Sequence, residues 1–266
     1  MTFAVLITAA LAVVIVMTVA GVLAFRTHKA VWIDPAWGSA FALVAVLTAA
    51  VASFGDTDDG DPVRRWLVAA LVAIWGGRLS WHLIGRVARA DQDDARYEEL
   101  LKGSIDEVPA SRVIRKIFVL QGVLVLIISA PVLVGVLADT WSWAIAVLGV
   151  LVWALGFFFE TVGDKQLRDY RADPDRGPIM DRGLWAWTRH PNYFGDACIW
   201  WGLWLVGGLA AGWVAGLATV IAPIAMTWFL TEVSGAKLLE RRMGGRDGWA
   251  EYAAKTPMFI PRPPRS

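Results

Sequence analysis

The stretch 197–231, ACIWWGLWLVGGLAAGWVAGLATVIAPIAMTWFLT, decides the fold because it is apolar throughout and carries no charged residue. As one helix it would be about 50 Å long at roughly 1.5 Å per residue, whereas the hydrocarbon core of a bilayer is about 30 Å thick. The stretch must therefore fold back. The glycine-rich segment Gly207–Gly212 predicts the hinge, which gives two short membrane spans.

The whole chain has the composition of a membrane protein. Hydrophobic residues make up 57% of its 266 residues, too many for an ordinary soluble domain. We expect an all-α, polytopic membrane protein, a single domain over 1–266 with seven transmembrane helices and cytoplasmic cofactor-binding loops. The first span has no basic residue before it, so we expect it to stay in the membrane and not to be removed as a signal. The expected spans are about 1–25, 36–54, 66–84, 117–137, 141–159, 197–209 and 213–231.

Charge predicts the orientation. With the C-terminus in the cytoplasm, the loops on that side hold 22 of the 25 Lys and Arg, whereas the other side holds only Arg64 and Arg65, and Arg78 lies within a span. This is the positive-inside pattern, with the N-terminus outside. The net charge of +1 gives no reason to expect a nucleic-acid partner.

The densest polar cluster lies directly before the stretch that decides the fold. Residues 183–196 read GLWAWTRHPNYFGD, and their position predicts a polar surface at the membrane boundary. A surface with arginine, histidine, asparagine and carboxylate side chains binds phosphate and amide groups better than it anchors a chain in the membrane. An acid at position 196 would begin the next helix, where the helix dipole favours it. The polar side chains are Arg189, His190, Asn192, Tyr193 and Asp196.

Two charges have positions that need an explanation. Arg78, in the third span, shares a helical face with Trp75 and His82, which predicts a polar stripe that faces something other than lipid. Snorkelling of Arg78 to the nearby inner surface is the alternative. Glu160 ends the fifth span, where the helix dipole disfavours a carboxylate.

A continuation of the fifth helix into the cytoplasm would place a row of charges on one face. Glu160, Asp164, Arg168 and Arg171 follow one another at spacings of four, four and three, and Asp173-Pro174 would end the helix. A solvated extension explains the pair Asp164 and Arg168 but not Glu160. We attribute Arg176 and Arg182, farther along, to the positive-inside pattern alone.

Several motifs of soluble enzymes are missing. The chain has no Gly-rich dinucleotide fingerprint between a strand and a helix, no phosphate-binding P-loop and no paired cysteines. The histidines at 28, 82 and 190 are too scattered for a convincing metal site, so we expect no metal. Any nucleotide must be held by side chains from the inner loops.

The segment Arg189–Asp196, RHPNYFGD, preceded by Gly183 and followed by a Trp-rich span, resembles the signature of the steroid 5-alpha-reductase C-terminal superfamily. That superfamily also includes sterol reductases and isoprenylcysteine carboxyl methyltransferases. Asp94–Tyr97, Leu238–Glu240 and Tyr252–Pro261 also fit a bacterial branch of it. The resemblance covers residues 66–262.

The resemblance implies a protein of the bacterial inner membrane that takes NADPH from the cytoplasmic side. It would reduce a carbon–carbon double bond of a steroid- or isoprenoid-like substrate that enters from the surrounding lipid. Glu160 falls where steroid reductases have an asparagine, and an ionised carboxylate can only accept hydrogen bonds. By analogy, the cofactor would be held by Asp164, Arg168, Arg171, Asn192 and Tyr193. The further cofactor-binding candidates are Glu160, Arg189, His190, Asp196, Arg78, Arg96 and Glu240.

The acid that would protonate the substrate is less clear. Steroid reductases pair a glutamate with a tyrosine, and this chain has Asp34 and Trp75 at comparable places. An indole cannot replace a phenol as proton donor, so a 3-oxo-steroid is an unsafe guess for the substrate. Asp34, His82, Tyr97 or a water could serve, and the spacing does not choose among them.

Two rival functions stay open. A membrane methyltransferase would use the same Arg-His-Pro-Asn-Tyr element around S-adenosylmethionine. Its relatives have a close glutamate pair after the last span, whereas Glu232 and Glu240 are eight apart, which favours the reductase. The other rival is a non-enzymatic scaffold or transporter, although no internal repeat suggests alternating access. The sequence does not choose between NADPH and NADH, and it indicates no oligomeric state.

Overall fold

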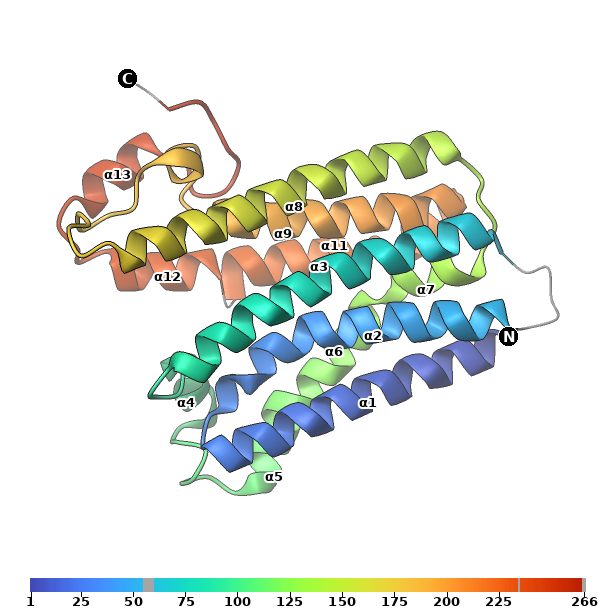
Figure 1. Cartoon of the computed structure of the whole chain (residues 1–266), viewed down its shortest axis with the longest axis horizontal. Coiled ribbons are helices and arrows are strands. Elements are labelled where there is room, and N and C mark those ends of the chain that lie inside the picture. Colours follow the sequence, from blue (N-terminus) through green and yellow to red (C-terminus); the bar gives the residue numbers. More distant parts are fainter. Residues whose placement is uncertain (55–59, 234, 265–266) are drawn as a thin grey trace. The chain divides into compact units, whose positions relative to one another are not determined.

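The structure is a computed structural model that describes residues 1–54, 60–233 and 235–264 (Figure 1). Every regular element in these residues is a helix. Six helices are long and apolar enough to cross a membrane, and a seventh crossing results if one bent pair counts as a single span. The all-α polytopic membrane fold is therefore confirmed.

The long candidate spans agree with the predicted order but extend beyond the apolar runs. They are Thr2–Thr27 (α1), Ala30–Ser53 (a 3-10 turn and α2, Ile33–Ser53), Pro62–Arg89 (α3), Trp143–Ala172 (α8), Pro191–Ala211 (α9, Pro191–Leu203, with short π and 3-10 segments) and Trp213–Met243. The last comprises α10 (Trp213–Thr219), α11 (Ile221–Trp228), a π segment (Phe229–Val233) and α12 (Ala236–Met243). Two short helices of the described residues lie outside the spans, α4 (Ala95–Leu101) and α13 (Trp249–Lys255), and a third, α5 (Ala110–Val113), begins the bent pair.

The region predicted as one straight span at 117–137 is bent. Ala110–Ile128, which includes α6 (Leu120–Ile128), meets α7 (Ala130–Leu137) at an angle of 43°. Pro131 lies in the first turn of α7. A proline has no N–H to donate to the carbonyl four residues earlier and its ring crowds that carbonyl, which bends a helix at that point.

The predicted hinge is confirmed. The helix of α9 loosens into a π segment over Trp204–Gly208 and ends at Gly212, whose φ of 124° lies in a region that favours glycine. After the turn, a Cβ on Gly216 would lie only 2.6 Å from the side chain of Leu209. The chain therefore turns tightly between Leu209 and Gly216.

The start of α9 differs from the prediction. The helix begins at Pro191, six residues before the predicted span, because proline is well suited to the first helical turn. Asp196 consequently lies in the second turn and not at the helix start, so the expected stabilisation by the helix dipole does not apply in that form. The prediction counted only apolar residues and left Pro191–Asp196 outside the helix.

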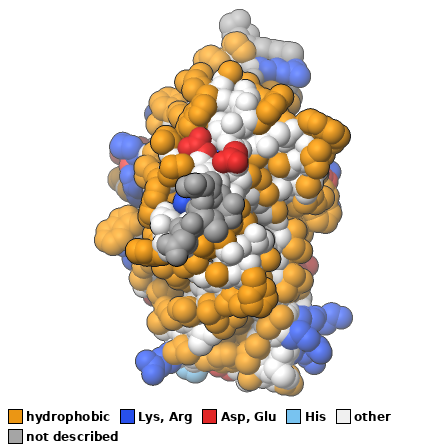
Figure 2. Space-filling view, turned by 90° about the vertical axis from the view of Figure 1, so that its right-hand side faces the viewer, with side chains coloured by type: hydrophobic (Ala, Val, Ile, Leu, Met, Phe, Trp, Pro, Cys, Tyr) orange, Lys and Arg blue, Asp and Glu red, His pale blue; other side chains and the backbone are white. Residues whose placement is uncertain are grey.

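The surface is that of an integral membrane protein. Figure 2 looks onto the ends of the helices, where many hydrophobic side chains lie among uncharged groups, backbone and a few charged side chains. Leu11, Val14, Leu151 and Leu217 are each more than half exposed on candidate spans. Apolar side chains in such number along helices long enough to span a bilayer are favourable in lipid and unfavourable in water.

The helices form two compact units. Unit 1 comprises residues 1–142 and 207–219, and unit 2 comprises residues 143–206 and 220–266. In unit 1, α2 and α3 cross at two glycines: a Cβ on Gly38 would lie 2.5 Å from the carbonyl oxygen of Gly76. Trp75 and Phe41 pack next to this crossing, with ring centroids 5.9 Å apart.

Unit 2 is organised by close contact between α8 and α9, which run side by side (Figure 1). Glycines recur every seven residues on both helices: three on α8 and two on α9. A Cβ on Gly195 would lie 2.4 Å from the backbone nitrogen of Glu160, and one on Gly202 would lie 2.6 Å from that of Trp153. Small residues at such spacing allow helix backbones to touch within a membrane. The glycines are Gly149, Gly156, Gly163, Gly195 and Gly202.

Replacing Gly195 should separate the two helices. We expect Gly195→Ala to lower the free energy of unfolding by about 1–3 kcal/mol, because the added methyl meets backbone and not a movable side chain. Thermal unfolding in detergent measures the effect. Gly77→Ala is the matched control, because nothing lies within 4 Å of its Cβ and alanine is the better helix former. Equal stability of the two variants would contradict the role of Gly195.

Candidate functional site

The main polar cluster lies in unit 2, where α8 passes from apolar to charged residues. The helix continues unbroken to Ala172, which is the case in which the sequence places Glu160, Asp164, Arg168 and Arg171 on one face. Glu160 is only 3% exposed and Asp164 only 9% exposed. Burying two carboxylates is costly unless hydrogen bonds compensate, so this pair of sites is the least expected feature of α8.

The first turn of α9 approaches α8 at this point. A Cβ on Gly163 would lie 3.2 Å from the backbone nitrogen of Asn192, and the Asn192 side-chain Nδ2 donates a hydrogen bond of 3.0 Å to Asp164 Oδ1. The amide of the signature is thus anchored to the carboxylate of α8. Its remaining amide hydrogen and its carbonyl oxygen are polar groups that a ligand could use.

Arg189 is held by the C-terminal part of the chain. Its guanidinium donates to both carboxylate oxygens of Glu240, at 2.7 and 3.1 Å, and to the carbonyls of Ala253 and Thr256, at 2.7 and 2.8 Å. These bonds use four of its five N–H donors. The guanidinium therefore clamps α12 and α13 to the signature, with little capacity left for a second anion.

His190 is buried beside the same carboxylate. Its Nε2 lies 3.2 Å from Glu240 Oε1, and its ring stacks on Tyr193 with centroids 5.5 Å apart. Burial lowers its pKa to about 4, against an opposing effect of Glu240. The neutral ring therefore donates from Nε2–H to Glu240, a tautomer assigned from this hydrogen bond, and leaves Nδ1 as an acceptor.

The C-terminal tail completes the loop that precedes α9. Thr188 Oγ1 donates to the carbonyl of Phe259 at 2.9 Å, and the backbone N–H of Arg262 donates to the carbonyl of Trp187 at 2.9 Å. Tyr252 donates its hydroxyl to the carbonyl of Trp185, and burial raises the pKa of that hydroxyl. The tail segment Tyr252–Pro261 thus has a packing role here.

Sequence reasoning missed two residues that attach this loop to α8. Gln166 Oε1 accepts a hydrogen bond of 3.0 Å from the backbone N–H of Leu184, and the Trp185 indole donates to the carbonyl of Gly163 at 3.1 Å. Gly183, with a φ of 61°, would clash with Gln166 if it carried a Cβ. The glycine at the start of the signature was the available signal, because a left-handed turn there favours glycine.

A second polar cluster lies in unit 1, centred on Asp34. Its carboxylate accepts hydrogen bonds from the Tyr97 hydroxyl and, at 2.9 Å each, from the guanidinium groups of Arg86 and Arg96. Burial together with the negative charge of Asp34 raises the pKa of Tyr97 well above its ordinary value. Burial acts to lower the pKa of Arg96, but Asp34 and Asp94 outweigh it and raise that pKa. Both groups stay protonated at neutral pH.

The structure therefore divides the predicted site residues between the two units. Asp34 and Tyr97, two of the three candidates for the catalytic acid, are brought together, and Arg78, His82 and Arg96 belong to the same unit. Arg168 and Arg171 are exposed near the end of α8, where Arg168 lies 3.8 Å from Asp169. The candidates in unit 2 are Glu160, Asp164, Arg168, Arg171, Arg189, His190, Asn192, Tyr193, Asp196 and Glu240.

The cluster in unit 2 offers hydrogen-bonding groups and cations, but not a metal site. No group of three or more metal-ligating side chains occurs within residues 1–54, 60–233 and 235–264. The buried carboxylates and amide suit an uncharged polar group, and the exposed arginines suit phosphates.

His190 should make stability depend on pH. Its pKa is about 4 when folded and about 6.5 when unfolded, so the unfolded chain binds more protons in between. The stabilisation is complete above about pH 6.5 and is lost as the pH falls toward 4. We expect the wild type to lose about 2 kcal/mol more than His190→Gln between pH 7 and pH 5. Thermal unfolding at the two pH values measures this, and identical losses would contradict it.

Tyr97 should stabilise unit 1 through Asp34. We expect Tyr97→Phe to lower the free energy of unfolding by about 1–2 kcal/mol, because a carboxylate loses a hydrogen-bond donor. In an Asp34→Asn background the same substitution should cost clearly less, which a double-mutant cycle measures. Additive effects would show that the two side chains are not coupled.

No curated protein and no solved structure matches the chain. Residues 20–256 match a family described as "Protein of unknown function (DUF1295)". This range includes the central residues of both polar clusters. Because the match extends over most of its length, the chain belongs to the DUF1295 family.

Proposed function

We propose that this protein is an NADPH-dependent membrane reductase of the steroid 5-alpha-reductase-like superfamily. It reduces a carbon–carbon double bond of a lipophilic, steroid- or isoprenoid-like substrate that enters from the bilayer. The C-terminus and the cluster of unit 2 face the cytoplasm of a bacterial cell, in accordance with the charge of the loops.

One observation carries the proposal: the pair Asp164–Asn192, next to the buried Glu160, where the apolar helices α8 and α9 meet. A primary carboxamide such as that of nicotinamide both donates and accepts hydrogen bonds. The carboxylates can only accept, whereas Asn192 can do both. The three side chains therefore provide the complementary set for such a group, in surroundings from which water is largely excluded.

The phosphates of the cofactor need cations nearby. Arg168 and Arg171 lie about one and two turns beyond Asp164 on α8 and are exposed. Guanidinium groups bind phosphates in a bidentate manner. Arg189 is less suited to this task because Glu240 and two carbonyls already engage it. We assign Arg189 a positioning role, in which it holds the tail against the loop before α9.

NADPH would supply the hydride, and the chain would supply binding, orientation and a proton. Tyr97 keeps its proton at neutral pH, which suits a donor and not a base. Its hydroxyl is engaged by Asp34, so a substrate would have to displace that hydrogen bond.

Calorimetric titration of the detergent-purified full chain tests the proposal. We expect binding of NADPH, and about tenfold weaker binding to Asp164→Asn, because a charged hydrogen-bond acceptor is lost while the shape is kept. Glu251→Gln is the matched control: it removes the charge of another carboxylate in unit 2 and keeps its shape, at an exposed side chain that pairs with Lys255. Its affinity should equal that of the wild type.

The ligands distinguish the rival functions. Binding of S-adenosylmethionine without binding of NADPH would overturn the reductase in favour of a methyltransferase. Binding of neither would favour a scaffold or transporter. Titration with NADH in place of NADPH shows whether the 2′-phosphate contributes to affinity.

A further inference from the structure

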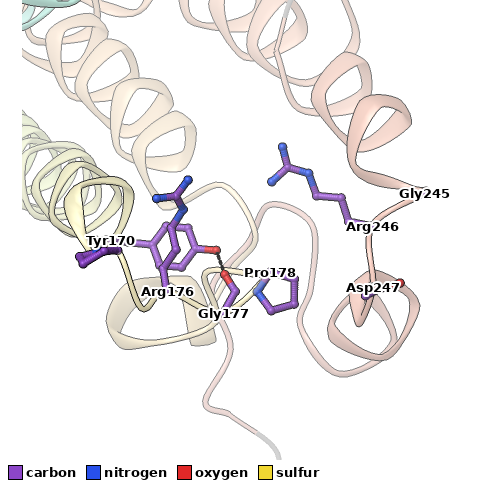
Figure 3. Close-up of a pocket in the computed structure, with 8 residues that line it drawn as sticks. Tyr170, Arg176, Gly177, Pro178, Gly245, Arg246 and Asp247 are labelled. Atoms are coloured by element: carbon purple, nitrogen blue, oxygen red, sulfur yellow. Dashed lines mark hydrogen bonds between the residues drawn. The ribbon is translucent and has the colours of Figure 1, made fainter.

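An open pocket of about 540 Å³ lies in unit 2, and none of the residues assigned to the cofactor lines it. One wall is the end of α8 and the loop after it, and the other is the turn between α12 and α13 (Figure 3). The lining residues are Tyr170, Pro174, Arg176, Gly177, Pro178, Gly245, Arg246 and Asp247.

Hydrogen bonds to backbone carbonyls hold both walls in place. Tyr170 donates its hydroxyl to the carbonyl of Gly177, which closes the loop after α8. On the other wall, the N–H of Arg246 donates to the carbonyl of Met243 at 2.9 Å, and its own carbonyl accepts from Trp249 at 3.1 Å. The wall that carries Arg246 is therefore held without its side chain. The side chain of Arg176 contributes only its two contacts within the loop.

The two arginines retain most of their donors. Arg176 uses only Nη1, which donates to the carbonyls of Arg171 and Asp173 at 3.0 and 3.3 Å. The guanidinium of Arg246 has no partner within the described part of the chain. Both side chains extend toward the same region from opposite walls (Figure 3). Two cations that converge on one region repel each other, and an anion placed between them relieves that repulsion.

The length of α8 indicates that this anion comes from water. A helix over Trp143–Ala172 is about 45 Å long, and the hydrocarbon core is about 30 Å thick. Trp143, 42% exposed, marks the opposite interface. Tyr170 then lies well past the hydrocarbon on the other side, and headgroups add only about 6 Å there. For a helix along the bilayer normal, the pocket lies at the outer edge of the headgroups, which favours a ligand from water over a lipid phosphate.

We propose that the pocket binds the phosphate group of a water-soluble phosphate monoester, gripped between Arg176 and Arg246. The volume exceeds that of a phosphate alone, so the rest of the ligand lies against Tyr170 and the two prolines. Asp247 repels a second anionic group and accepts hydrogen bonds, which favours a ligand with hydroxyl or amino groups. This site does not depend on the proposed reductase activity.

Thermal unfolding of the full chain in detergent, with inorganic phosphate at constant ionic strength, tests the proposal. We expect saturable stabilisation of the wild type, with an affinity about tenfold weaker in Arg176→Gln and in Arg246→Gln. Arg242→Gln is the matched control, because it removes one exposed cation from α12 outside the pocket. Stabilisation that is absent, or equally lost in Arg242→Gln, would overturn the proposal.

Two further measurements distinguish the alternatives. In nanodiscs, phosphate should stabilise the protein equally with zwitterionic lipid alone and with added anionic lipid. Competition between anionic lipid and phosphate for the same two arginines would identify a headgroup and overturn the water-soluble ligand. If the variants do not fold, the test is chemical modification of the wild-type arginines by phenylglyoxal. Phosphate should slow modification of Arg176 and Arg246 but not of Arg242, and equal rates would refute the site.

Discussion

Contact between the backbones of α8 and α9 is the constraint on which unit 2 depends. In lipid, apolar side chains gain nothing by leaving their surroundings, so close van der Waals packing must hold helices together. Gly156, Gly163 and Gly195 allow that packing, since side chains there would collide with backbone atoms. The same contact brings Asn192 to Asp164 and fixes the carbonyl that receives the Trp185 indole. The polar cluster is thus a product of small residues that have no polar chemistry of their own.

The polar residues of the signature have two different roles. Arg189 and His190 share Glu240 and attach the C-terminal helices, whereas Asn192 and Asp164 form the surface that a cofactor would contact. A motif rich in polar residues can therefore be partly structural. The basic residues at the same end of α8 divide in a similar way. Arg168 and Arg171 follow Asp164 on α8, and Arg176 lines a separate pocket with Arg246.

Much of the fold was predictable because its signals are local. Apolar runs predicted the spans, and Gly207–Gly212 predicted the turn. The bend at Pro131 and the early start of α9 were missed because hydropathy alone does not register a missing N–H or a proline at a helix start. The partners of Arg189 lie about 50 to 70 residues away. No spacing rule connects residues so distant, and the same holds for Arg176 and Arg246.

The docking of the tail has a consequence for biogenesis. Thr188 and Trp187 find their hydrogen-bond partners at Phe259 and Arg262, so a segment translated some 70 residues later completes this loop. Helices α8 and α9 can enter the bilayer during synthesis, but the loop between them stays unfinished until residues 259–262 have been made. Quality control that acts on truncated or stalled products would therefore meet a protein that is already inserted, yet open at its water-facing end.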